Sequence, residues 1–381
     1  MSISAPQSLA LYIHFPWCIQ KCPYCDFNSH QLKNDLPEKQ YISALLEDLQ
    51  QTLTQVDNPA RIRSIFMGGG TPSLFSPDAL QHLLDNIPPI MPFAEEIEIT
   101  LEANPGTFES AKFHDFYSLG INRLSIGIQS FQDRHLKTLG RIHDAGQARK
   151  AIDIARQAGF KRLNLDLMFA LPDQQPDEAL QDINTALSYN PSHLSFYQLT
   201  LEPNTYFHRY PPRLPEDDDT YAIQNSCQQQ LAEQGFQQYE ISAYSRNDDY
   251  CRHNLNYWQF GDYLGIGAGA HGKFRQAETG RIIRTVKPKN PAQYLQNPGQ
   301  LSTQEIPTAE LPLEFVMNNL RLKNGFHLKQ FEQRTGLSRQ SLEPALSQCI
   351  QQGLLINRQQ QVYCTKTGWN YLDSILEKFI P

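Results

Sequence analysis

The sequence has no long apolar run, no basic stripe and no secretory-type leader. No stretch approaches the roughly 18 consecutive apolar residues of a membrane-spanning helix. The first ten residues, MSISAPQSLA, lack the basic and apolar regions of a signal peptide. The net charge of −7 over 381 residues argues against a general nucleic-acid binder. We therefore expect a cytoplasmic protein with no nucleic-acid partner, for which peripheral contact with a membrane stays open.

Cysteine is scarce, and three of the seven cysteines lie in one short segment. Cys18, Cys22 and Cys25 follow the apolar run Leu9–Phe15 with the spacing C-x3-C-x2-C. Three thiolates supply three of the four iron ligands of a [4Fe–4S] cluster, so the spacing predicts a cluster with one iron open to a small chelating molecule. The alternatives are a zinc site that lacks one ligand, or three unrelated cysteines. The remaining cysteines have no ligand spacing and are expected to be free thiols of a reducing compartment: Cys227, Cys251, Cys349 and Cys364.

Short apolar segments alternate with helical patterns through the first 200 residues, which predicts an α/β fold built from βαβ units on a parallel sheet. Helical patterns cover 36–53, 77–86, 144–159 and 176–188. The unusual polar residues all come at the carboxyl ends of the expected strands, so we favour a curved, incomplete barrel over a doubly wound sheet. The expected strands are Leu9–Phe15, Arg63–Met67, Ile97–Leu101, Asn122–Ile128, Arg162–Met168 and His193–Leu199.

The chain is expected to divide into three parts. Residues 1–240 would form the barrel, and residues 241–305 would close it with the dense segment YCRHNLNYWQFGDYLGIGAGAHG. Residues 306–381 combine helical patterns with a short extended pair, which is typical of a small winged-helix-like domain. Its basic residues do not cluster, so we expect contact with a partner or with the barrel rather than with DNA.

Several residues at the expected barrel mouth could bind a small ligand. The glycine run that ends in Gly69, Gly70 and Thr71 is either a tight turn or a backbone surface for an amino acid's amine and carboxylate. Glu102 could accept hydrogen bonds from a ribose or an ammonium group, or could cap the next helix. Three further polar residues are also expected at the barrel mouth: Gln129, Arg141 and Asp166.

The C-x3-C-x2-C loop after a first strand resembles the signature of the radical S-adenosylmethionine (SAM) enzymes. That resemblance implies a partial (β/α)6 barrel, which agrees with the six expected strands. It also implies that the amino and carboxylate groups of SAM chelate the open iron. In such enzymes an electron from the cluster cleaves SAM to methionine and a 5′-deoxyadenosyl radical.

Further segments are similar, over nearly the whole chain, to the family of oxygen-independent coproporphyrinogen III oxidases and its close relatives. These segments are YIHFPWC…CPYC, GGGTPS, EANPG, GIQSF, LGRIH, NLDLM…LP and GIGAGAHG. The family places one SAM on the cluster and a second beside it. The resemblance implies that the first SAM is contacted by Tyr12, Tyr24, Gly69 and Glu102, with His271 closing its site. It implies that the second site is lined by Gly70, Thr71, Gln129, Arg141, Asp166 and Thr200.

Two departures argue against porphyrinogen decarboxylation. The oxidases read C-x3-C-x2-C-x-C, and their last cysteine is needed for activity, whereas this chain has Phe27 at that position. The oxidases also carry a longer N-terminal extension than the short segment that precedes Leu9 here.

The segment His253-Asn254-Leu255-Asn256-Tyr257-Trp258 points to a different function. Neutral imidazole is a standard ligand of haem iron, and aromatic faces suit a porphyrin plane. A structural histidine beside core aromatics is the plainer interpretation. The pattern H-N-x-x-Y-W resembles the haem-binding motif of the radical SAM haem chaperones of the HemW type, which pass haem to acceptor proteins such as respiratory enzymes.

The sequence therefore predicts a haem chaperone on a radical SAM scaffold, with one [4Fe–4S] cluster, SAM and haem as its cofactors and His253 as the haem ligand. The main alternative is an oxygen-independent coproporphyrinogen III dehydrogenase, a radical SAM oxidative decarboxylase. A further alternative is a protein-interaction module in which the cluster is only structural. Whether the protein is an enzyme, whether SAM is cleaved, and whether it forms a homodimer stay open.

Overall fold

Six parallel strands, in the order in which they occur in the chain, form the centre of the main sheet. A computed structural model describes residues 9–56, 61–276 and 279–381. Neighbouring strands that follow the chain order are the result of successive βαβ units. All six expected strands are confirmed, with their ends shifted by a few residues: β1 (Leu9–Phe15), β4 (Ile62–Gly69), β5 (Phe93–Ala103), β6 (Arg123–Gln129), β7 (Arg162–Phe169) and β8 (His193–Gln198).

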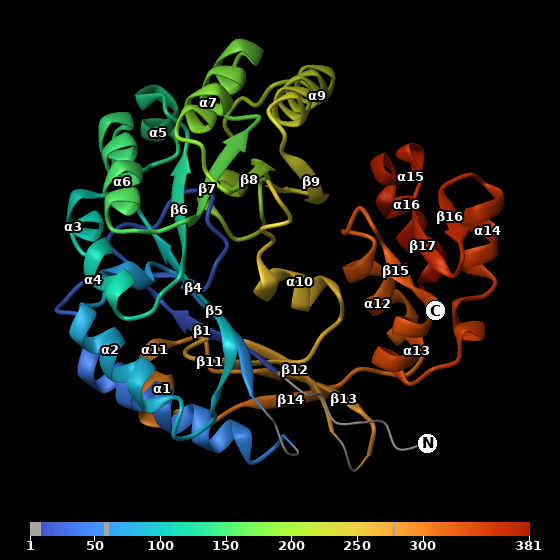
Figure 1. Ribbon diagram of the computed structural model, residues 1–381, viewed down its shortest axis with the longest axis horizontal. Helices are drawn as coiled ribbons and strands as arrows, with labels where there is room; N and C mark the ends of the chain where they lie inside the picture. The colour runs from blue at the N-terminus through green and yellow to red at the C-terminus, as the bar shows by residue number, and fades with distance from the viewer. Residues whose placement is uncertain (1–8, 57–60, 277–278) are drawn as a thin grey trace.

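Helices cover the outer side of these strands, as the blue and green ribbons of Figure 1 show. In α2, for example, the buried side chains Leu80, Leu83 and Leu84 share one helical face. The predicted helices are confirmed. The helices of this region are α1 (Glu38–Leu53), α2 (Pro77–Asn86), α3 (Thr107–Ser110), α4 (Phe113–Ser118), α5 (Asp133–Thr138), α6 (Ala145–Gln157), α7 (Pro176–Ser188), α8 (Tyr206–Arg209) and α9 (Asp217–Glu233).

The sheet continues past the six strands at both edges. On one side β11 pairs in parallel with β1, and β12, β13 and β14 follow it antiparallel. On the other side β10 and then β9 add antiparallel beside β8. Within the described residues the sheet runs from β14 to β9 without closing, as expected of a partial barrel. The added elements are β9 (Gln237–Glu240), β10 (Ala243–Ser245), α10 (Arg252–Trp258), β11 (Tyr263–Ile266), β12 (His271–Arg275), β13 (Ile282–Val286), α11 (Pro291–Gln296) and β14 (Ser302–Glu305).

The loop after β1, which carries the three cysteines, is held by a small sheet of its own. Strand β2 (Trp17–Cys18) pairs in parallel with β3 (His30–Gln31), so the chain leaves the barrel and returns to it over eleven intervening residues. The Asn28 side-chain amide donates to the carbonyl groups of Ala268 (2.9 Å) and Lys289 (3.0 Å). These bonds tie the cysteine loop to the chain around β12.

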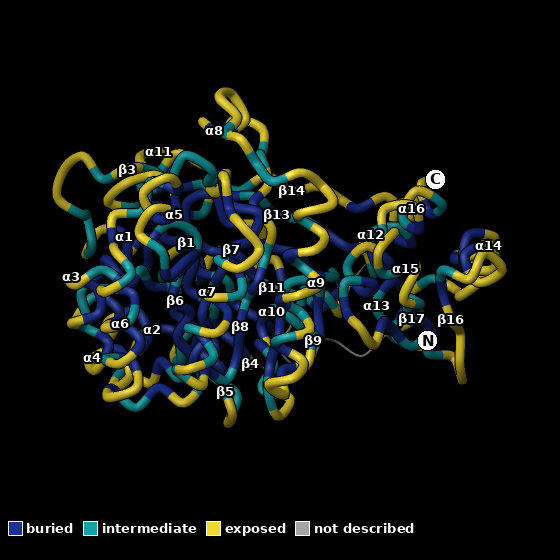
Figure 2. Tube along the Cα trace, turned by 90° about the horizontal axis from the view of Figure 1, so that it is seen from above, coloured by how far each residue is buried: buried dark blue, intermediate teal, exposed yellow. Residues whose placement is uncertain are grey.

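Residues 306–381 form a second unit with its own hydrophobic core. Buried aromatics such as Phe315, Phe326 and Phe331 centre this core, and Phe260 reaches into it from the barrel side. Figure 2 shows the unit standing beside the barrel. No helix of the described residues is long and apolar enough to cross a membrane. The elements are α12 (Leu311–Asn319), β15 (Phe326–His327), α13 (Leu328–Thr335), α14 (Ala345–Gln351), β16 (Leu355–Arg358), β17 (Gln361–Cys364), α15 (Lys366–Asn370) and α16 (Leu372–Leu376).

Candidate functional site

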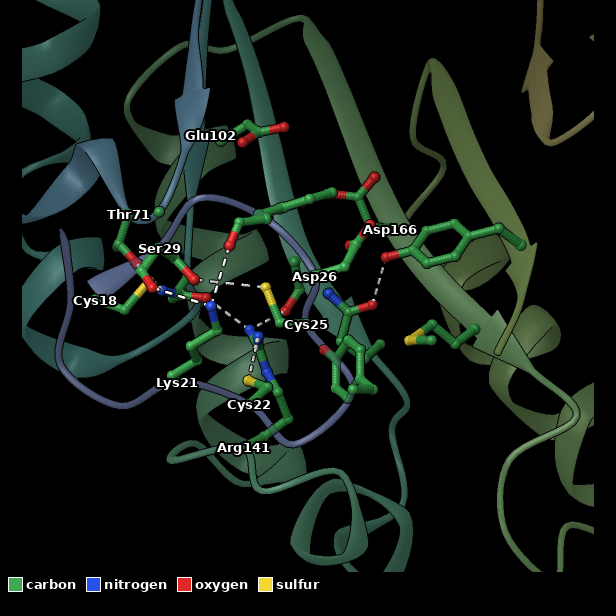
Figure 3. A pocket seen from close by; sticks show the side chains of 18 of the residues that line it. Cys18, Lys21, Cys22, Cys25, Asp26, Ser29, Thr71, Glu102, Arg141 and Asp166 are labelled. Atoms are coloured by element: carbon green, nitrogen blue, oxygen red, sulfur yellow. Dashed lines mark hydrogen bonds between the residues drawn. The ribbon is translucent and has the colours of Figure 1, made fainter. Parts of the chain in front are cut away.

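A cavity of about 540 Å³ opens at the carboxyl ends of the parallel strands. We call it the cluster cavity, because the three cysteines after β1 form part of its wall; Figure 3 shows their side chains facing residues from the other strand ends. It brings together the predicted cluster residues and all of the predicted SAM residues except Tyr12 and His271: Cys18, Cys22, Cys25, Tyr24, Gly69, Gly70, Thr71, Glu102, Gln129, Arg141, Asp166 and Thr200.

Two residues at this mouth take left-handed backbone conformations. Gly69 ends β4 with φ +104°, and a β-carbon there would lie 2.3 Å from Cε1 of His14. Gln129 ends β6 with φ +69°, although it is not glycine. Its side-chain oxygen accepts a hydrogen bond from the Tyr197 hydroxyl at 2.8 Å, which holds the amide in the cavity wall. The sequence analysis did not select Tyr197, although this residue lies near the carboxyl end of the expected strand His193–Leu199.

Each cysteine sulfur has a different hydrogen-bonding neighbour. The Thr71 hydroxyl donates to Cys18 Sγ at 3.4 Å, and Arg141 Nη1 donates to Cys22 Sγ at 3.7 Å. Cys25 Sγ lies 3.6 Å from the Ser29 hydroxyl. Burial raises the pKa of the Cys18 and Cys25 thiols, so an incoming metal has to displace their protons.

The donor set fits a [4Fe–4S] cluster. A cubane takes one thiolate on each of three different irons, and all three sulfurs face one cavity. Beside the cysteines, the Arg141 Nε atom is buried without an acceptor among the described residues, as expected where a ligand oxygen binds.

Asn104 links the glycine run to Arg141. Its amide nitrogen donates to the Thr71 hydroxyl at 2.9 Å, and its oxygen accepts from Arg141 Nη2 at 2.6 Å. The same guanidinium nitrogen donates to the Gly127 carbonyl at 2.8 Å. The sequence analysis selected Glu102, two positions earlier, but did not select Asn104.

Two half-buried carboxyl groups face the cluster cavity. Glu102 accepts a hydrogen bond from the Gly69 backbone N–H at 3.2 Å, and burial, reinforced by the charge of Asp166, raises its pKa to about 7. Burial also raises the pKa of Asp166, which accepts from the side chains of Ser125 (3.0 Å) and Asn164 (2.8 Å). A cationic or hydroxyl-bearing ligand would relieve the repulsion between these carboxylates.

A second cavity of about 530 Å³ lies on the β11–β12 side of the first. We call it the side cavity. It is lined by Tyr12 and His271, and it shares Asp26, Phe27, Gly69 and Glu102 with the cluster cavity. Of the residues expected around the first SAM, Tyr12 and His271 line only the side cavity, and Tyr24 lines only the cluster cavity. Gly69 and Glu102 line both. The residues expected for the second SAM line only the cluster cavity.

His253 lines neither cavity. The side chain of this α10 residue has 0% exposure, its Nδ1 lies 3.1 Å from the Ser64 hydroxyl, and its Nε2 lies 2.8 Å from the Tyr257 hydroxyl. Burial lowers its pKa to about 3. Tyr257 and Trp258 of the same motif do line the side cavity. An iron atom could reach His253 only after the bond to Tyr257 opens, so its role as haem ligand stays a prediction.

Two family models match the chain. Residues 12–186 match the radical SAM superfamily, and residues 306–371 match the HemN C-terminal domain. Over 375 residues, and 98% of both chains, the protein is 47% identical to the heme chaperone HemW of Haemophilus influenzae. The identity is 46% over 372 residues with the Escherichia coli heme chaperone HemW, again 98% of both chains.

The chain belongs to the heme chaperone HemW family. A more distant heme chaperone HemW, from Bacillus subtilis, is 33% identical over 365 residues, which cover 94% of this chain and 95% of that one. The HemW-type resemblance seen in the motifs is thereby confirmed.

The fold also matches a solved structure. The radical SAM enzyme coproporphyrinogen III oxidase (HemN) of Escherichia coli superposes with a TM-score of 0.81, covering 99% of this chain and 92% of that one at 20% identity. This confirms the radical SAM fold that the sequence predicted.

Proposed function

We propose that this protein is a haem chaperone that binds one [4Fe–4S] cluster, SAM and haem and transfers haem to acceptor proteins. Membership of the heme chaperone HemW family carries this proposal. The cluster cavity supports it, because three cysteines and the SAM-type polar residues face one another there. When bound, the cluster supplies an iron with an open position at which SAM can be chelated.

Two sets of residues near the cysteines would each bind one SAM. Gly69 and Glu102, with Tyr12 beyond them, would hold a first SAM through backbone and carboxylate acceptors. The second set would hold another SAM, with Arg141 as the charged donor to its carboxylate: Gly70, Thr71, Gln129, Arg141, Asp166 and Thr200. The hydrogen bond from Thr71 to Cys18 and the one from Arg141 to Cys22 couple this second set to the cysteines.

Phe27 separates this proposal from porphyrinogen decarboxylation. Its side chain is 57% exposed and lies where the two cavities meet. A phenyl ring carries no thiol and can relay neither a hydrogen atom nor an electron in place of one. We therefore infer that coproporphyrinogen III is not decarboxylated, and that SAM and the cluster regulate haem loading or partner choice. Cytoplasmic location and delivery to respiratory enzymes remain part of the proposal.

Two anaerobic assays on cluster-reconstituted protein test the function. In the first, haem-loaded protein is mixed with apomyoglobin as a general acceptor, and transfer is followed by absorbance, with free haem and haem-loaded albumin as controls. Saturable haem binding followed by transfer is expected. Protein that binds no haem, or that never releases it, would contradict the chaperone function.

The second assay contains SAM, a reductant, coproporphyrinogen III and an electron acceptor. No tetrapyrrole product is expected over background. Protoporphyrinogen formed over many turnovers, and lost in the Cys18→Ala variant, would instead show an oxidative decarboxylase.

A further inference from the structure

Asn104 lies between the two side chains that donate hydrogen bonds to the sulfurs of Cys18 and Cys22. It directly follows β5, which lies between β4 and β6 in the main sheet. Thr71 follows β4, and Arg141 belongs to the segment after β6 that joins α5 to α6. The half-buried amide of Asn104 therefore connects donors that come from the two sides of β5. Figure 3 shows both donors beside the cysteine loop.

The hydrogen bonds around Asn104 can run in one direction only. A guanidinium group carries N–H donors and no acceptor, so the atom of Asn104 that faces Arg141 Nη2, 2.6 Å away, has to be the side-chain oxygen. The amide nitrogen then faces Thr71 and donates to its hydroxyl oxygen at 2.9 Å. A hydroxyl has a single proton, and that of Thr71 is left for Cys18 Sγ at 3.4 Å. We call this series of bonds, from Arg141 through Asn104 and Thr71 to Cys18, the Asn104 bridge.

The bridge fixes a donor at each of two cysteine sulfurs. Because the Asn104 oxygen holds Nη2 of Arg141, the Nη1 atom of the same guanidinium points at Cys22 Sγ, 3.7 Å away. The Thr71 hydroxyl is the donor to Cys18. A thiolate that binds iron has no proton, so the sulfur accepts in both contacts. Such hydrogen bonds stabilise the additional negative charge of a reduced cluster and are one of the factors that set its reduction potential.

We propose that Asn104 is a positioning residue of the cluster site, which directs the Thr71 and Arg141 donors to two cluster sulfurs and thereby raises the reduction potential of the cluster. This inference rests on the proposed function, in which the three cysteines hold a [4Fe–4S] cluster. The bridge begins at a positive charge, so each of its bonds polarises the next and strengthens the last one, to Cys18. A given electron donor reduces a cluster of higher potential more completely.

The test is the midpoint potential of the full-length, cluster-reconstituted protein without SAM. It is measured by anaerobic titration with a chemical reductant and read by electron paramagnetic resonance of the reduced cluster. Thr71→Val removes the Cys18 donor. At a fixed potential it should lower the ratio of reduced to oxidised cluster by about threefold to tenfold, a fall of up to about 59 mV in midpoint potential.

Asn104→Asp should lower the reduced fraction further than Thr71→Val does. A carboxylate has no donor, so it accepts the Thr71 proton that Cys18 otherwise receives, and it adds a negative charge near the cluster. The iron content should equal that of the wild type. A merely structural amide would leave the potential of Asn104→Asp within about twofold of the wild-type ratio, and that result would overturn the proposal.

Ser29 provides the matched control for the path through Thr71. Its hydroxyl donates to Cys25 Sγ at 3.6 Å and, among the described residues, makes no hydrogen bond to a member of the Asn104 bridge. Ser29→Ala should therefore lower the potential by itself, and the effect of Asn104→Asp should keep its full size in that background.

In the Thr71→Val background, the effect of Asn104→Asp should shrink by the factor that Thr71→Val costs alone, because the bond to Cys18 is already absent. Equal effects of Asn104→Asp in the wild-type, Ser29→Ala and Thr71→Val backgrounds would overturn the proposal, since Asn104 would then not act through Thr71.

Asn104→Ala covers the case in which Asn104→Asp assembles no cluster. It adds no charge, releases both donors and should lower the reduced-to-oxidised ratio about threefold or more. A full cluster with the wild-type potential would overturn the proposal. So would loss of the cluster from this variant too, because Asn104 would then be needed to build the site. A wild-type protein that assembles no cluster would instead refute the proposed function, so the two failures are distinguishable.

Discussion

The imidazole of His253 and the phenol of Tyr257 form one hydrogen-bonded unit, with Nε2 and the hydroxyl oxygen 2.8 Å apart. Because the Ser64 hydroxyl lies at the other ring nitrogen, His253 joins β4 to α10. In this arrangement the buried ring of His253 also holds the phenol of Tyr257, which lines the side cavity.

His253→Ala should lower the free energy of unfolding by about 3 kcal/mol, because it leaves the buried Ser64 hydroxyl and the half-buried Tyr257 hydroxyl without this partner and opens a cavity. Urea unfolding of the cluster-free protein measures this. His114→Ala should change stability by no more than about 0.5 kcal/mol. Equal effects of the two substitutions would show that the Ser64–His253–Tyr257 contacts are not formed.

Replacing any of Cys18, Cys22 or Cys25 with alanine should abolish the brown cluster chromophore and the bound iron, because each thiolate would hold a different iron. Iron analysis and visible absorbance after anaerobic reconstitution measure this. Cys364→Ala removes a half-buried thiol of β17 and should keep the full iron content. Full iron content in a variant of the loop cysteines would refute that ligand.

Arg141→Lys should weaken SAM binding by about tenfold at one of two sites, because lysine keeps the charge but cannot reach Cys22, Asn104 and a ligand carboxylate together. Calorimetric titration of the reconstituted protein measures this. Arg134→Lys, on an exposed side chain of α5, is the matched control. Unchanged SAM binding in Arg141→Lys would remove Arg141 from the second SAM site.

Gly69→Ala should destabilise the protein through two separate effects. The left-handed backbone conformation costs about 1–2 kcal/mol for an L-residue. The clash with His14 should add about 1–3 kcal/mol. Gly120→Ala is the matched control, since Gly120 has φ +87° and open space around its β-position, so only the backbone cost applies. Equal destabilisation by Gly69→Ala and Gly120→Ala would mean that the added β-carbon at position 69 does not clash with the ring of His14.

Asp182 should give the protein a pH-dependent stability. Its carboxylate accepts from the Ser130 hydroxyl (2.6 Å) and the Phe131 N–H (2.8 Å), next to Gln129. Burial raises its pKa from 3.8 to about 6, so the folded state holds this proton more tightly than the unfolded chain. Its contribution to stability is complete below 3.8 and is lost as the pH rises through about 6.

The Asp182→Asn variant should remove that slope between pH 4 and pH 6, because the amide does not ionise there. Urea unfolding at a series of pH values measures it. A variant whose stability changes with pH as the wild type's does would assign the slope to other groups.

The barrel and its mouth were predictable because two simple patterns coincide. Apolar strands such as Leu9–Phe15 are buried on both faces, which gives continuous apolar runs rather than alternation. Residues after such strands must meet at one end of a parallel sheet, so Glu102 and Asp166 could be placed together without coordinates.

Other features depend on contacts that no local pattern encodes. The strands β11 to β14 are short, and their pairing beside β1 joins residues more than 200 positions apart. Asn104 and Tyr197 act through hydrogen bonds to residues far away in the sequence, Arg141 and Gln129. The ring of His253 contacts the hydroxyl of Ser64, which lies 189 positions away. A motif identifies a residue's chemistry, but packing decides whether that chemistry faces a ligand.

The partition between the two cavities has a thermodynamic consequence. Gly69 and Glu102 contribute to both cavities, so a ligand that contacts them on one side changes the surface offered on the other. Linkage requires that any factor by which SAM alters the affinity for a side-cavity ligand equals the factor by which that ligand alters the affinity for SAM. A ligand bound in one cavity can therefore be detected as a changed binding affinity of the other cavity, even when no SAM is cleaved.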